Sequence, residues 1–580
     1  MKKILLLFAL IFAFASCTLE EDLRSKSTPE TYYQTTPQIL TGLNGCYAPL
    51  RSIYSSMNYF QLCEAASDLI NHSTNLRDAQ CDISQSYPRY GSTLWTLCYR
   101  GVMRCNAMYA AIERAPLTQS EKAPLFAECV ILRAYYYYIL TINFNNVPYY
   151  WDEVTDANND IISSLPRMSA VELRNELYDQ LWYWLADEEG CQKALPYNKT
   201  YVPENDYRIG SMVGFVLAGK MAMWNHQWNK AIKCFQYIED VYGCLEDGAY
   251  TPINSLLGYP LTDIMFRNRY TEESIWELPA YAKEYGLRVH GTLASRCMPP
   301  RSTIGGDDTE EEEEEILDDE TAQEVSSISD YYNGIVIPEL GKQAYTSKAY
   351  RPTNYFIKNL MPYTGAKTDK RTSVYDTTQI SGTSKDTTPR EIEGSAGYLA
   401  WCYSGWLKDE DQTPENRKLH FFNGVGKASA KPYLGDKFWC PGMVYNHDTN
   451  NLKIFRFATV VLDLAECWME MGDWEKANGY LNATRRRAGL EPVSFTGDEH
   501  GFLNALYEES GRELFGEFSR RHNLVRWGVF YDRITNYADT SYLKNNVKEG
   551  PCREFYPIPL EQIELSHYNL DNNEYAKYGL

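Results

Sequence analysis

Residues 211–240 read SMVGFVLAGKMAMWNHQWNKAIKCFQYIED, and this stretch decides the fold of the chain. Apolar residues recur at helical spacing on both sides of a short polar turn at Asn225–Trp228. The small residue Gly219 lies in the first predicted helix, and Ala231 and Phe235 lie one turn apart in the second. Because a glycine lets another chain segment approach closely, the stretch predicts two antiparallel helices packed against each other.

A second helix–turn–helix stretch lies in the last third of the chain, with its turn at Gly472-Asp473. Two such units are typical of tetratricopeptide-like repeats. Stripes at three-and-four spacing, around residues 95–110 and 131–138, predict further paired helices. We therefore expect a mostly α fold, with a tetratricopeptide-like helical-pair scaffold and a large, irregular, loop-rich insert. The residues of the second unit are Val460, Leu464, Cys467, Trp468, Met471, Ala477 and Leu481.

The insert is predicted at residues 245–450, where helical periodicity fails and Gly, Pro, Thr and Tyr become frequent. Only short strand-like pieces such as Ser274–Leu278 stand out within it. Loops carried on a rigid scaffold usually hold the binding groups, so we expect the ligand site here. Residues 46–244 and 451–580 form the helical regions before and after the insert, and all three regions are expected to form one compact domain.

Composition excludes several classes of protein. The 580 residues carry 56 basic and 77 acidic side chains, a formal charge of −21, which argues against nucleic acid as a partner. Hydrophobic residues make up 44% of the chain, enough for a large core and too many for general disorder. The 47 Tyr and 13 Trp residues exceed the ordinary needs of a core, and these side chains suit half-wet binding surfaces.

The N-terminus has the pattern of a secretory signal. Lys2 and Lys3 precede an apolar stretch of about twelve residues, too short to span a membrane. The stretch ends at Ala15-Ser16-Cys17, which resembles a bacterial lipoprotein cleavage box. We therefore predict a signal peptide at 1–16, lipidation of Cys17 and an extended leader at 17–45. An ordinary signal peptide cut nearby is the alternative.

No cofactor is expected from the sequence. The cysteines form no C-x-x-C pair, and the eight histidines show no ligand spacing. Cys98, Cys105, Cys129, Cys234 and Cys467 lie among apolar neighbours and are predicted to be core residues. The run from Asp307 to Glu320 holds eleven acids in fourteen residues; we interpret it as a solvated tract, with a Ca²⁺ site as the alternative.

Motifs along most of the chain resemble the SusD/RagB family of nutrient-binding outer-membrane lipoproteins. They occur in the family's order and together with the lipoprotein box. They are Leu132-Arg133-Ala134, Val147-Pro148, Glu273–Glu277, Ile454–Ala458, Leu464-Ala465-Glu466, Met471-Gly472-Asp473, Arg485–Leu490, Arg512–Glu517, Arg520-Arg521, Leu524–Gly528 and Tyr556–Pro559. The chain departs from the family pattern at Asn145-Asn146 and at Ser566–Asn569, which affects local turns only.

The resemblance implies a function in glycan uptake. It implies a lipid-anchored protein on the surface of the outer membrane that captures an oligosaccharide or polysaccharide. The protein then delivers this ligand to a SusC-like TonB-dependent transporter, without catalysis. The motif arginines Arg133, Arg456, Arg485, Arg512 and Arg526 lie near helix ends or face acids, and we expect their guanidinium groups to tie helices together.

Candidate ligand contacts follow from the chemistry of sugars, which need flat rings under their C–H faces and polar groups around their rims. They lie in two segments in which members of the resembled family place ligand contacts, the loop before the first helix pair and the insert. A buried ring is the alternative for any of the tyrosines, and an ion pair is the alternative for Asp68 and Arg77. The candidates are Asp68, Asn71, Arg77, Asp78, Tyr87 and Tyr90 in the loop, and Tyr281, Tyr285, Tyr331, Tyr332, Tyr345 and Tyr350 in the insert.

Two other functions remain open on the sequence alone. A surface glycoside hydrolase would need two carboxylates at a set separation, but no pair stands out, and no G-x-S-x-G or H-E-x-x-H motif occurs. A SusD/RagB-type uptake component, or a tetratricopeptide adaptor, that binds peptide or protein is the second alternative. Tests for new reducing ends and for glycan retention separate these functions from glycan binding.

Overall fold

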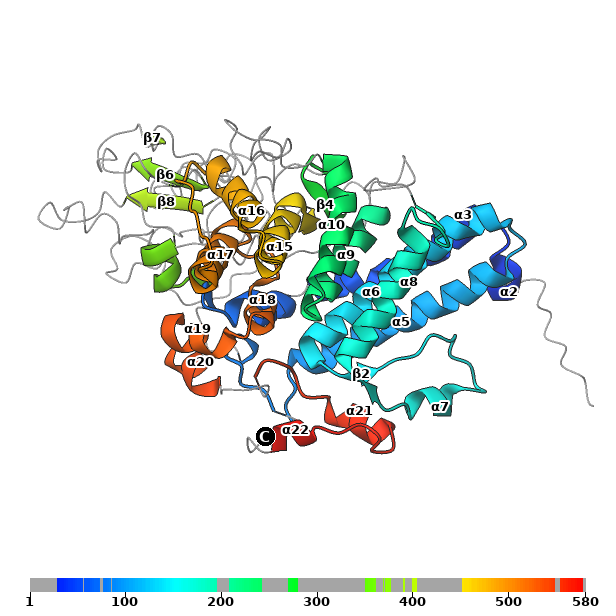
Figure 1. Cartoon of the computed structure of the whole chain (residues 1–580). Coiled ribbons are helices and arrows are strands. Elements are labelled where there is room, and N and C mark those ends of the chain that lie inside the picture. Colours follow the sequence, from blue (N-terminus) through cyan, green and yellow to red (C-terminus); the bar gives the residue numbers. More distant parts are fainter. Residues whose placement is uncertain are drawn as a thin grey trace, which may run out of the picture.

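The protein is mostly α-helical, and its helices stack in antiparallel neighbours (Figure 1). It is described here from a computed structural model of the chain. The structure describes residues 29–55, 57–72, 77–84, 86–195, 208–242, 270–279, 350–360, 369, 371–376, 390–391, 399–403, 451–547 and 553–576. The signal peptide, Cys17 and the acidic run at 307–320 lie outside these residues.

The first half of the chain supplies three long helices and their connections. Its elements are α2 Pro29–Tyr32, α3 Thr36–Tyr54, α4 Met57–Phe60, a π-helical turn Gln61–Ala65, β1 Ile70–His72, a 3₁₀ turn Asp78–Gln80, α5 Tyr90–Arg114, α6 Gln119–Phe144, β2 Val147–Pro148, α7 Asn159–Ser163, β3 Arg167–Met168, α8 Ala170–Leu185, α9 Ser211–Trp224 and α10 Trp228–Tyr242.

The second half adds short strands and a further group of helices. Its elements are β4 Ser274–Leu278, β5 Tyr350–Pro352, a π-helical turn Phe356–Leu360, β6 Thr372–Asp376, β7 Arg390–Glu391, β8 Leu399–Tyr403, β9 Leu452–Arg456, α15 Phe457–Glu470, α16 Trp474–Arg487, α17 Glu499–Glu513, α18 Arg520–Arg526, α19 Phe530–Tyr537, α20 Ser541–Asn546, α21 Leu560–Leu565 and α22 Asn573–Ala576.

Both helix pairs predicted from the sequence are confirmed. Helices α9 and α10 pack together around the turn at residues 225–227, and α15 packs on α16 around Met471–Asp473. Close packing in the first pair depends on Gly219, because a Cβ there would lie 2.4 Å from the ring of Phe235. In the second pair Gly472 has a φ of +77°, a left-handed conformation that favours glycine at the turn.

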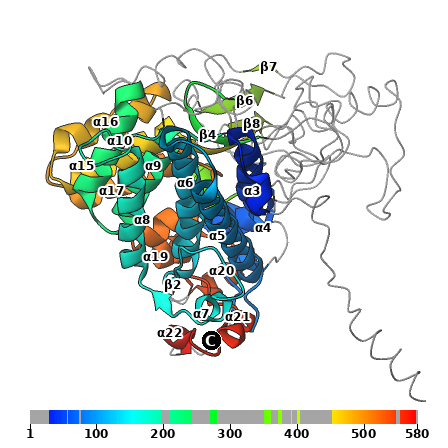
Figure 2. The same ribbon diagram turned by 90° about the vertical axis from the view of Figure 1, so that its right-hand side faces the viewer.

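Helix α6 lies at the centre of the first half. It begins at a capping box formed by Thr118 and Glu121, in which the Thr118 amide donates to the Glu121 carboxylate at 2.8 Å. By length and composition it could cross a membrane, but 94% of its apolar window is buried inside the protein. Helices α3, α5, α8 and α9 pack around it (Figure 2), so α6 is the core of this half.

Residues 36–45 correct one prediction, because they form the first part of α3 and not an extended leader. Thr35 and Gln38 make a capping box at the start of α3, and Pro37 occupies one of the first two helical positions, where it has no amide to lose. The Thr36-Pro37 pair therefore lies at the start of a helix and does not interrupt one.

The strand predicted at Ser274–Leu278 is confirmed as β4. It pairs antiparallel with β9, with Ser274 opposite Arg456 and Leu278 opposite Leu452. Two motifs that lie about 180 residues apart in the sequence are therefore neighbours in space. The other described ladders are β1–β5, β2–β3 and the three-stranded β7–β6–β8.

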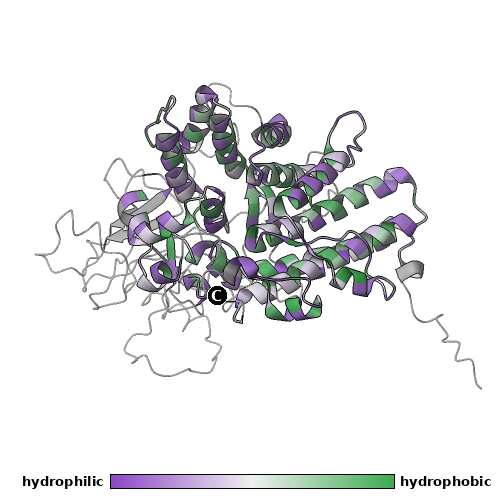
Figure 3. Cartoon of the chain, turned by 60° about the horizontal axis from the view of Figure 1, so that its bottom comes forward, coloured by the Kyte–Doolittle hydropathy of each residue, from purple (hydrophilic) through white to green (hydrophobic). Residues whose placement is uncertain are grey.

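One hydrophobic core joins the two helical regions. A single cluster of buried side chains runs from Ile39 in α3 to Leu570 after α21, and it includes residues of α6, α9, α15 and α17. In Figure 3 hydrophobic and hydrophilic segments alternate along the long helices, as expected for helices with one buried side. The five cysteines predicted to be core residues are buried, and the nine cysteines whose side chains the structure describes are free thiols.

We predict that Gly101→Ala destabilises the packing of α5 on α6. A Cβ at residue 101 would lie 2.3 Å from the ring of Tyr136, which cannot move away easily because its hydroxyl donates to the Cys46 carbonyl at 2.5 Å. Overpacking of this kind costs about 1–3 kcal/mol. Urea denaturation followed by circular dichroism measures the change.

Gly45→Ala is the matched control, because nothing lies within 4 Å of the added Cβ and the residue is also inside a helix. This variant should be more stable by about 0.5–1 kcal/mol. Equal unfolding midpoints for the two variants would contradict the close approach of α5 and α6.

Candidate functional site

Strands β1 and β5 bring together the two segments in which ligand contacts were predicted. Ile70 pairs with Pro352 and His72 pairs with Tyr350, so the loop before α5 and a described part of the insert form one ladder. The Thr353 amide extends the ladder by donating to the Leu69 carbonyl at 2.8 Å. The candidate site is therefore built from residues of this loop, close to where the insert joins the scaffold.

Asp68, a predicted ligand contact, is a buried structural carboxylate, which corrects that prediction. Its side chain is 0% exposed. Arg520 donates to both carboxylate oxygens at 2.8 Å, and the Nε of Arg533 donates to Oδ2 at 2.9 Å. Burial opposes ionisation, but these two guanidinium groups hold the pKa of Asp68 below its usual value. The ion pair noted as the alternative is present, with Arg520 and Arg533 as partners.

Tyr90 and Tyr350 are also buried, so a ligand on the surface cannot reach either ring. Tyr90 is 5% exposed and opens α5. Tyr350 is 1% exposed, and its ring packs edge-on against Phe60 at 4.9 Å and His72 at 4.8 Å between centroids. For these two tyrosines the alternative of a buried ring holds.

Asn71 and Asp78 connect the loop to the last third of the chain. The side-chain amide of Asn71 donates to Asp539 at 2.8 Å. Asp78 accepts a hydrogen bond from the Tyr556 hydroxyl at 2.9 Å and one from the Tyr90 amide at 3.2 Å. Burial raises the pKa of Asp78. Asp78 mainly fixes the loop, whereas Asn71 lies on β1 and is only half-buried.

Four residues of the loop form an exposed group that we call the Tyr87 cluster: Arg77, Asp82, Tyr87 and Arg89. The ring of Tyr87 is 63% exposed, and the Arg89 guanidinium lies 5.3 Å from its centroid. Asp82 lies 3.5 Å from an Arg77 nitrogen and 3.8 Å from an Arg89 nitrogen. The loop thus presents a flat ring with one guanidinium beside it, and an acceptor and a second guanidinium follow next to that group, which is the combination of groups that a sugar requires.

A tight turn holds the ring of the Tyr87 cluster in place. The backbone amides of Ser84 and Tyr87 each donate to the other's carbonyl, at 3.3 and 3.1 Å. Arg89, which follows, has a φ of +54°, which turns the chain into α5. Arg77 and Tyr87 were predicted from the sequence as ligand contacts, but Asp82 and Arg89 were not. In the sequence, the only indication that Asp82 and Arg89 belong to the site is that they lie in the same polar loop.

The other predicted contacts lie outside the described residues. They are Tyr281, Tyr285, Tyr331, Tyr332 and Tyr345. Their assignment as ligand contacts stays a prediction.

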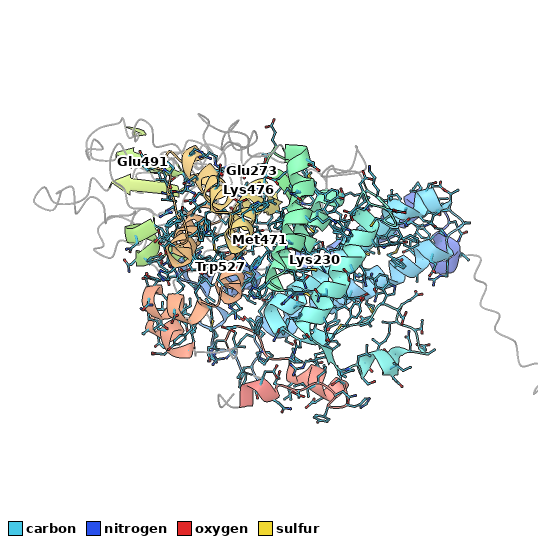
Figure 4. All side chains as sticks on the ribbon, in the orientation of Figure 1. Lys230, Glu273, Met471, Lys476, Glu491 and Trp527 are labelled. Atoms are coloured by element: carbon cyan, nitrogen blue, oxygen red, sulfur yellow. The ribbon has the colours of Figure 1, made fainter. Side chains whose placement is uncertain are left out.

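Arg456, one of the motif arginines, has the structural role predicted for it. Arg456 donates to Glu273 and Glu513 at 2.7 Å and to Glu517 at 2.8 Å, and Arg487 also binds Glu273 and Glu513. Glu273 lies among the helices α15–α17 (Figure 4). We call Glu273, Arg456, Arg487, Glu513 and Glu517 the charge network.

Arg526 makes a second, separate connection between helices. Its guanidinium binds both oxygens of Glu466 on α15, at 2.5 and 2.6 Å, and the indole of Trp527 donates to the same carboxylate at 2.9 Å. Trp527 lies beside α18 (Figure 4). Since Glu466 and the acids of the charge network are bound by arginines, these buried carboxylates form structural pairs. In the described part of the chain, no three His, Cys, Asp or Glu residues group as a metal site.

Two family models match different parts of the chain. One, described as the SusD family, matches residues 313–575, and the other, described as starch-binding associating with outer membrane, matches residues 19–199. The chain is 24% identical to SusD-like protein P25 of Formosa agariphila over 598 aligned positions, covering 99% of this chain and 98% of the relative. It is 25% identical to starch-binding protein SusD of Bacteroides thetaiotaomicron over 37% of this chain and 36% of that protein.

Solved structures have the same fold. A SusD homolog from Bacteroides thetaiotaomicron superposes with a TM-score of 0.65 at 16% identity, covering 94% of this chain and 98% of the other. Surface glycan-binding protein A from the same organism, solved in complex with laminarihexaose, gives 0.61 at 17% identity, with 93% and 99% covered. A laminarin-binding SusD-like protein gives 0.59 at 16% identity, with 92% and 98% covered.

We predict that Asp68→Asn destabilises the protein without changing the exposed surface. Removing one partner of a buried ion pair leaves Arg520 and Arg533 uncompensated, which costs about 3–5 kcal/mol at neutral pH. Because the pKa of Asp68 is lowered in the folded state, its contribution is complete above the unfolded pKa of about 3.9 and is lost as the pH falls through the folded value. Chemical denaturation at several pH values should show the gap between wild type and variant narrowing below about pH 4.

Asp82→Asn is the matched control, since Asp82 is half-exposed and its two arginines lie at 3.5 and 3.8 Å. Its stability should stay within about 0.5 kcal/mol of wild type. A stability loss for Asp82→Asn as large as that for Asp68→Asn would contradict this account.

Proposed function

The chain belongs to the SusD/RagB family, and from this premise we propose that it is a non-catalytic glycan-binding lipoprotein of the outer-membrane surface. It captures an oligosaccharide or polysaccharide and delivers it to a SusC-like TonB-dependent transporter. The names of its relatives support glycan as the ligand class. They include a starch-binding protein, a laminarin-binding protein and a protein solved with laminarihexaose.

The observation that carries the proposal is the exposure of the Tyr87 ring among groups that bind hydroxyls. An exposed tyrosine ring can stack on the C–H face of a sugar, and Arg89 beside the ring, with Asp82 and Arg77 next in the same loop, offers donors and an acceptor for hydroxyls. A net hydrogen bond is worth only about 0.5–1.5 kcal/mol. Such a surface is suited to weak, reversible capture.

Anchoring at Cys17 is part of the proposal. The apolar stretch that ends at Ala15-Ser16-Cys17 supports a lipid on the cysteine, and the family description of association with the outer membrane agrees with it. A single acyl chain holds a protein at a membrane only weakly, so stable attachment needs more than one. A lipid anchor would keep the glycan site close to a transporter and raise the effective concentration of captured ligand.

Three buried carboxylates support the part of the proposal that the protein is not an enzyme. A glycoside hydrolase needs two carboxyl groups free to face one glycosidic bond. Asp68, Glu466 and Glu513 are each bound by arginines, and their surroundings are dry. None of these three carboxylates is available to act on a sugar.

We predict that Tyr87→Ala weakens glycan retention while folding persists. The protein lacking residues 1–17 is run in native affinity gels that contain laminarin, starch or alginate. Wild type should be retained by one polysaccharide class, and loss of one stacking ring should weaken binding about three- to tenfold. Tyr542→Ala is the matched control, because Tyr542 is a tyrosine of similar exposure, 57%, on α20 and is not part of the Tyr87 cluster.

Two results would contradict the proposal. One is that Tyr87→Ala and the insert variants Tyr281→Ala and Tyr331→Ala are retained as strongly as wild type. In that case these three tyrosines do not contact the glycan. The other is the appearance of new reducing ends when the purified protein is incubated with these glycans, which would make it an enzyme.

A further inference from the structure

A groove lies between helices α5, α6 and α8, on a part of the protein that the proposed site does not use. Its volume is about 530 Å³, which is within the range of small-molecule sites. These three helices run side by side in Figure 1. Trp151, in the chain after β2, also lines the groove. The groove is lined by Tyr109, Glu113, Gln119, Lys122, Phe126, Trp151, Asp179, Gln180, Tyr183 and Trp184.

The aromatic residues form a continuous wall. Ring centroids are 5.3 Å apart between Trp151 and Tyr109, 4.5 Å between Tyr109 and Phe126, 5.4 Å between Phe126 and Trp184, and 5.3 Å between Trp184 and Tyr183. The wall runs from buried rings in the groove to Tyr183, which is 45% exposed. A flat ligand face can therefore pack on it from solvent.

Trp151 is held in position by a buried arginine. The guanidinium of Arg133 lies 3.1 Å from the centroid of a Trp151 ring and covers one of its faces. Arg133 is itself fixed by hydrogen bonds to Asn106 at 3.1 Å and Gln180 at 3.2 Å. The wall is thus preorganised, and a ligand does not need to order it.

The other half of the lining is polar. Lys122 donates to the Glu113 backbone carbonyl at 2.8 Å, which leaves the Glu113 carboxylate free of described hydrogen bonds. An oxygen of the Asp179 carboxylate lies 3.9 Å from the Lys230 Nζ, which is a long ion pair. Among the residues that the structure describes, no aliphatic side chain lines the groove. The lining thus combines aromatic rings with groups that bind hydroxyls, in equal number. A pyranose needs both, because it has C–H faces and a rim of hydroxyls.

We infer that this groove is a second carbohydrate site, for a neutral pyranose unit of a glycan. Its two carboxylates, Glu113 and Asp179, outnumber Lys122, so an anionic sugar is disfavoured. An apolar peptide side chain would leave the polar half unpaired. The inference rests on one part of the proposed function, which is that glycans are the ligands of this protein.

The groove is distinct from the Tyr87 cluster. Tyr109 lies nineteen residues along α5 from Tyr90, about 28 Å at 1.5 Å per residue. A polysaccharide bound at both places would gain retention by multivalency, whereas a short sugar would bind each place independently. Two separate weak sites are therefore expected to favour long chains over short ones.

Calorimetric titration with laminarihexaose, maltohexaose and cellohexaose tests the inference. For the hexasaccharide that binds, Tyr183→Ala should remove a ring from the rim of the groove and weaken one class of site about three- to tenfold. Glu113→Gln should weaken the same class while keeping the side-chain shape, so a folding defect cannot explain both losses. Tyr87→Ala should affect only the other class, and Tyr542→Ala neither.

The outcomes separate the two proposals. Binding that depends on Tyr87 but is unchanged in Tyr183→Ala and Glu113→Gln would overturn the groove and keep the proposed site. Binding that depends on the groove residues and not on Tyr87 would support the groove and would remove the Tyr87 cluster as a ligand site. Two further results would overturn the groove as a carbohydrate site. One is that wild type binds none of the hexasaccharides. The other is that wild type binds an aromatic-rich peptide and the groove variants do not.

Discussion

The carboxylate of Glu513 is the point on which the second half of the structure depends. Three arginines from different segments surround it: Arg371 before β6 at 3.0 Å, Arg456 at the end of β9 at 2.7 Å, and Arg487 at the end of α16. Burial alone would raise its pKa, but these guanidinium groups hold the pKa of Glu513 well below its usual value. Because all four groups are buried, the loss of any one leaves uncompensated charge in the core.

The charge network and the Asp68 pair give the chain its compact arrangement. The network joins β4, β9, α16 and α17, and the pair joins the loop before α5 to α18 and α19. Tyr556 also reaches the loop by its bond to Asp78. The first and last thirds of the chain therefore share one core, and the Tyr87 cluster lies in a loop fixed by residues from both.

Sequence reasoning succeeded where the determining interactions are local. The pairs at 211–240 and 457–487 follow from helical periodicity, and β4 follows from a short apolar run. It failed where the partner is distant. Asp68 looked like a ligand contact because its partner, Arg520, lies 452 residues away, and no single-sequence pattern connects them. The groove was missed for the same reason, since its lining comes from three helices and a connecting segment.

The prediction that the extended leader at 17–45 includes residues 36–45 was wrong for a different reason. The segment was predicted to be extended because Thr36-Pro37 looks like an interruption, although Pro37 fits the first turn of a helix and Thr35 and Gln38 form the capping box that starts it. A proline can either break a helix or occupy its first turn, and the local sequence fits both. Here the helix forms because Ile39 and Leu43 are buried in the core.

The thiols of the helical core have a consequence for a protein predicted to be exported into an oxidising compartment. Cys46, Cys98 and Cys467 are each 0% exposed, and burial raises the pKa of the Cys98 and Cys467 thiols, which keeps them protonated. Oxidants and alkylating reagents can reach these sulfurs only when helices separate. The rate at which such reagents label these thiols therefore reports how often the native state opens. No engineered cysteine is needed for this measurement.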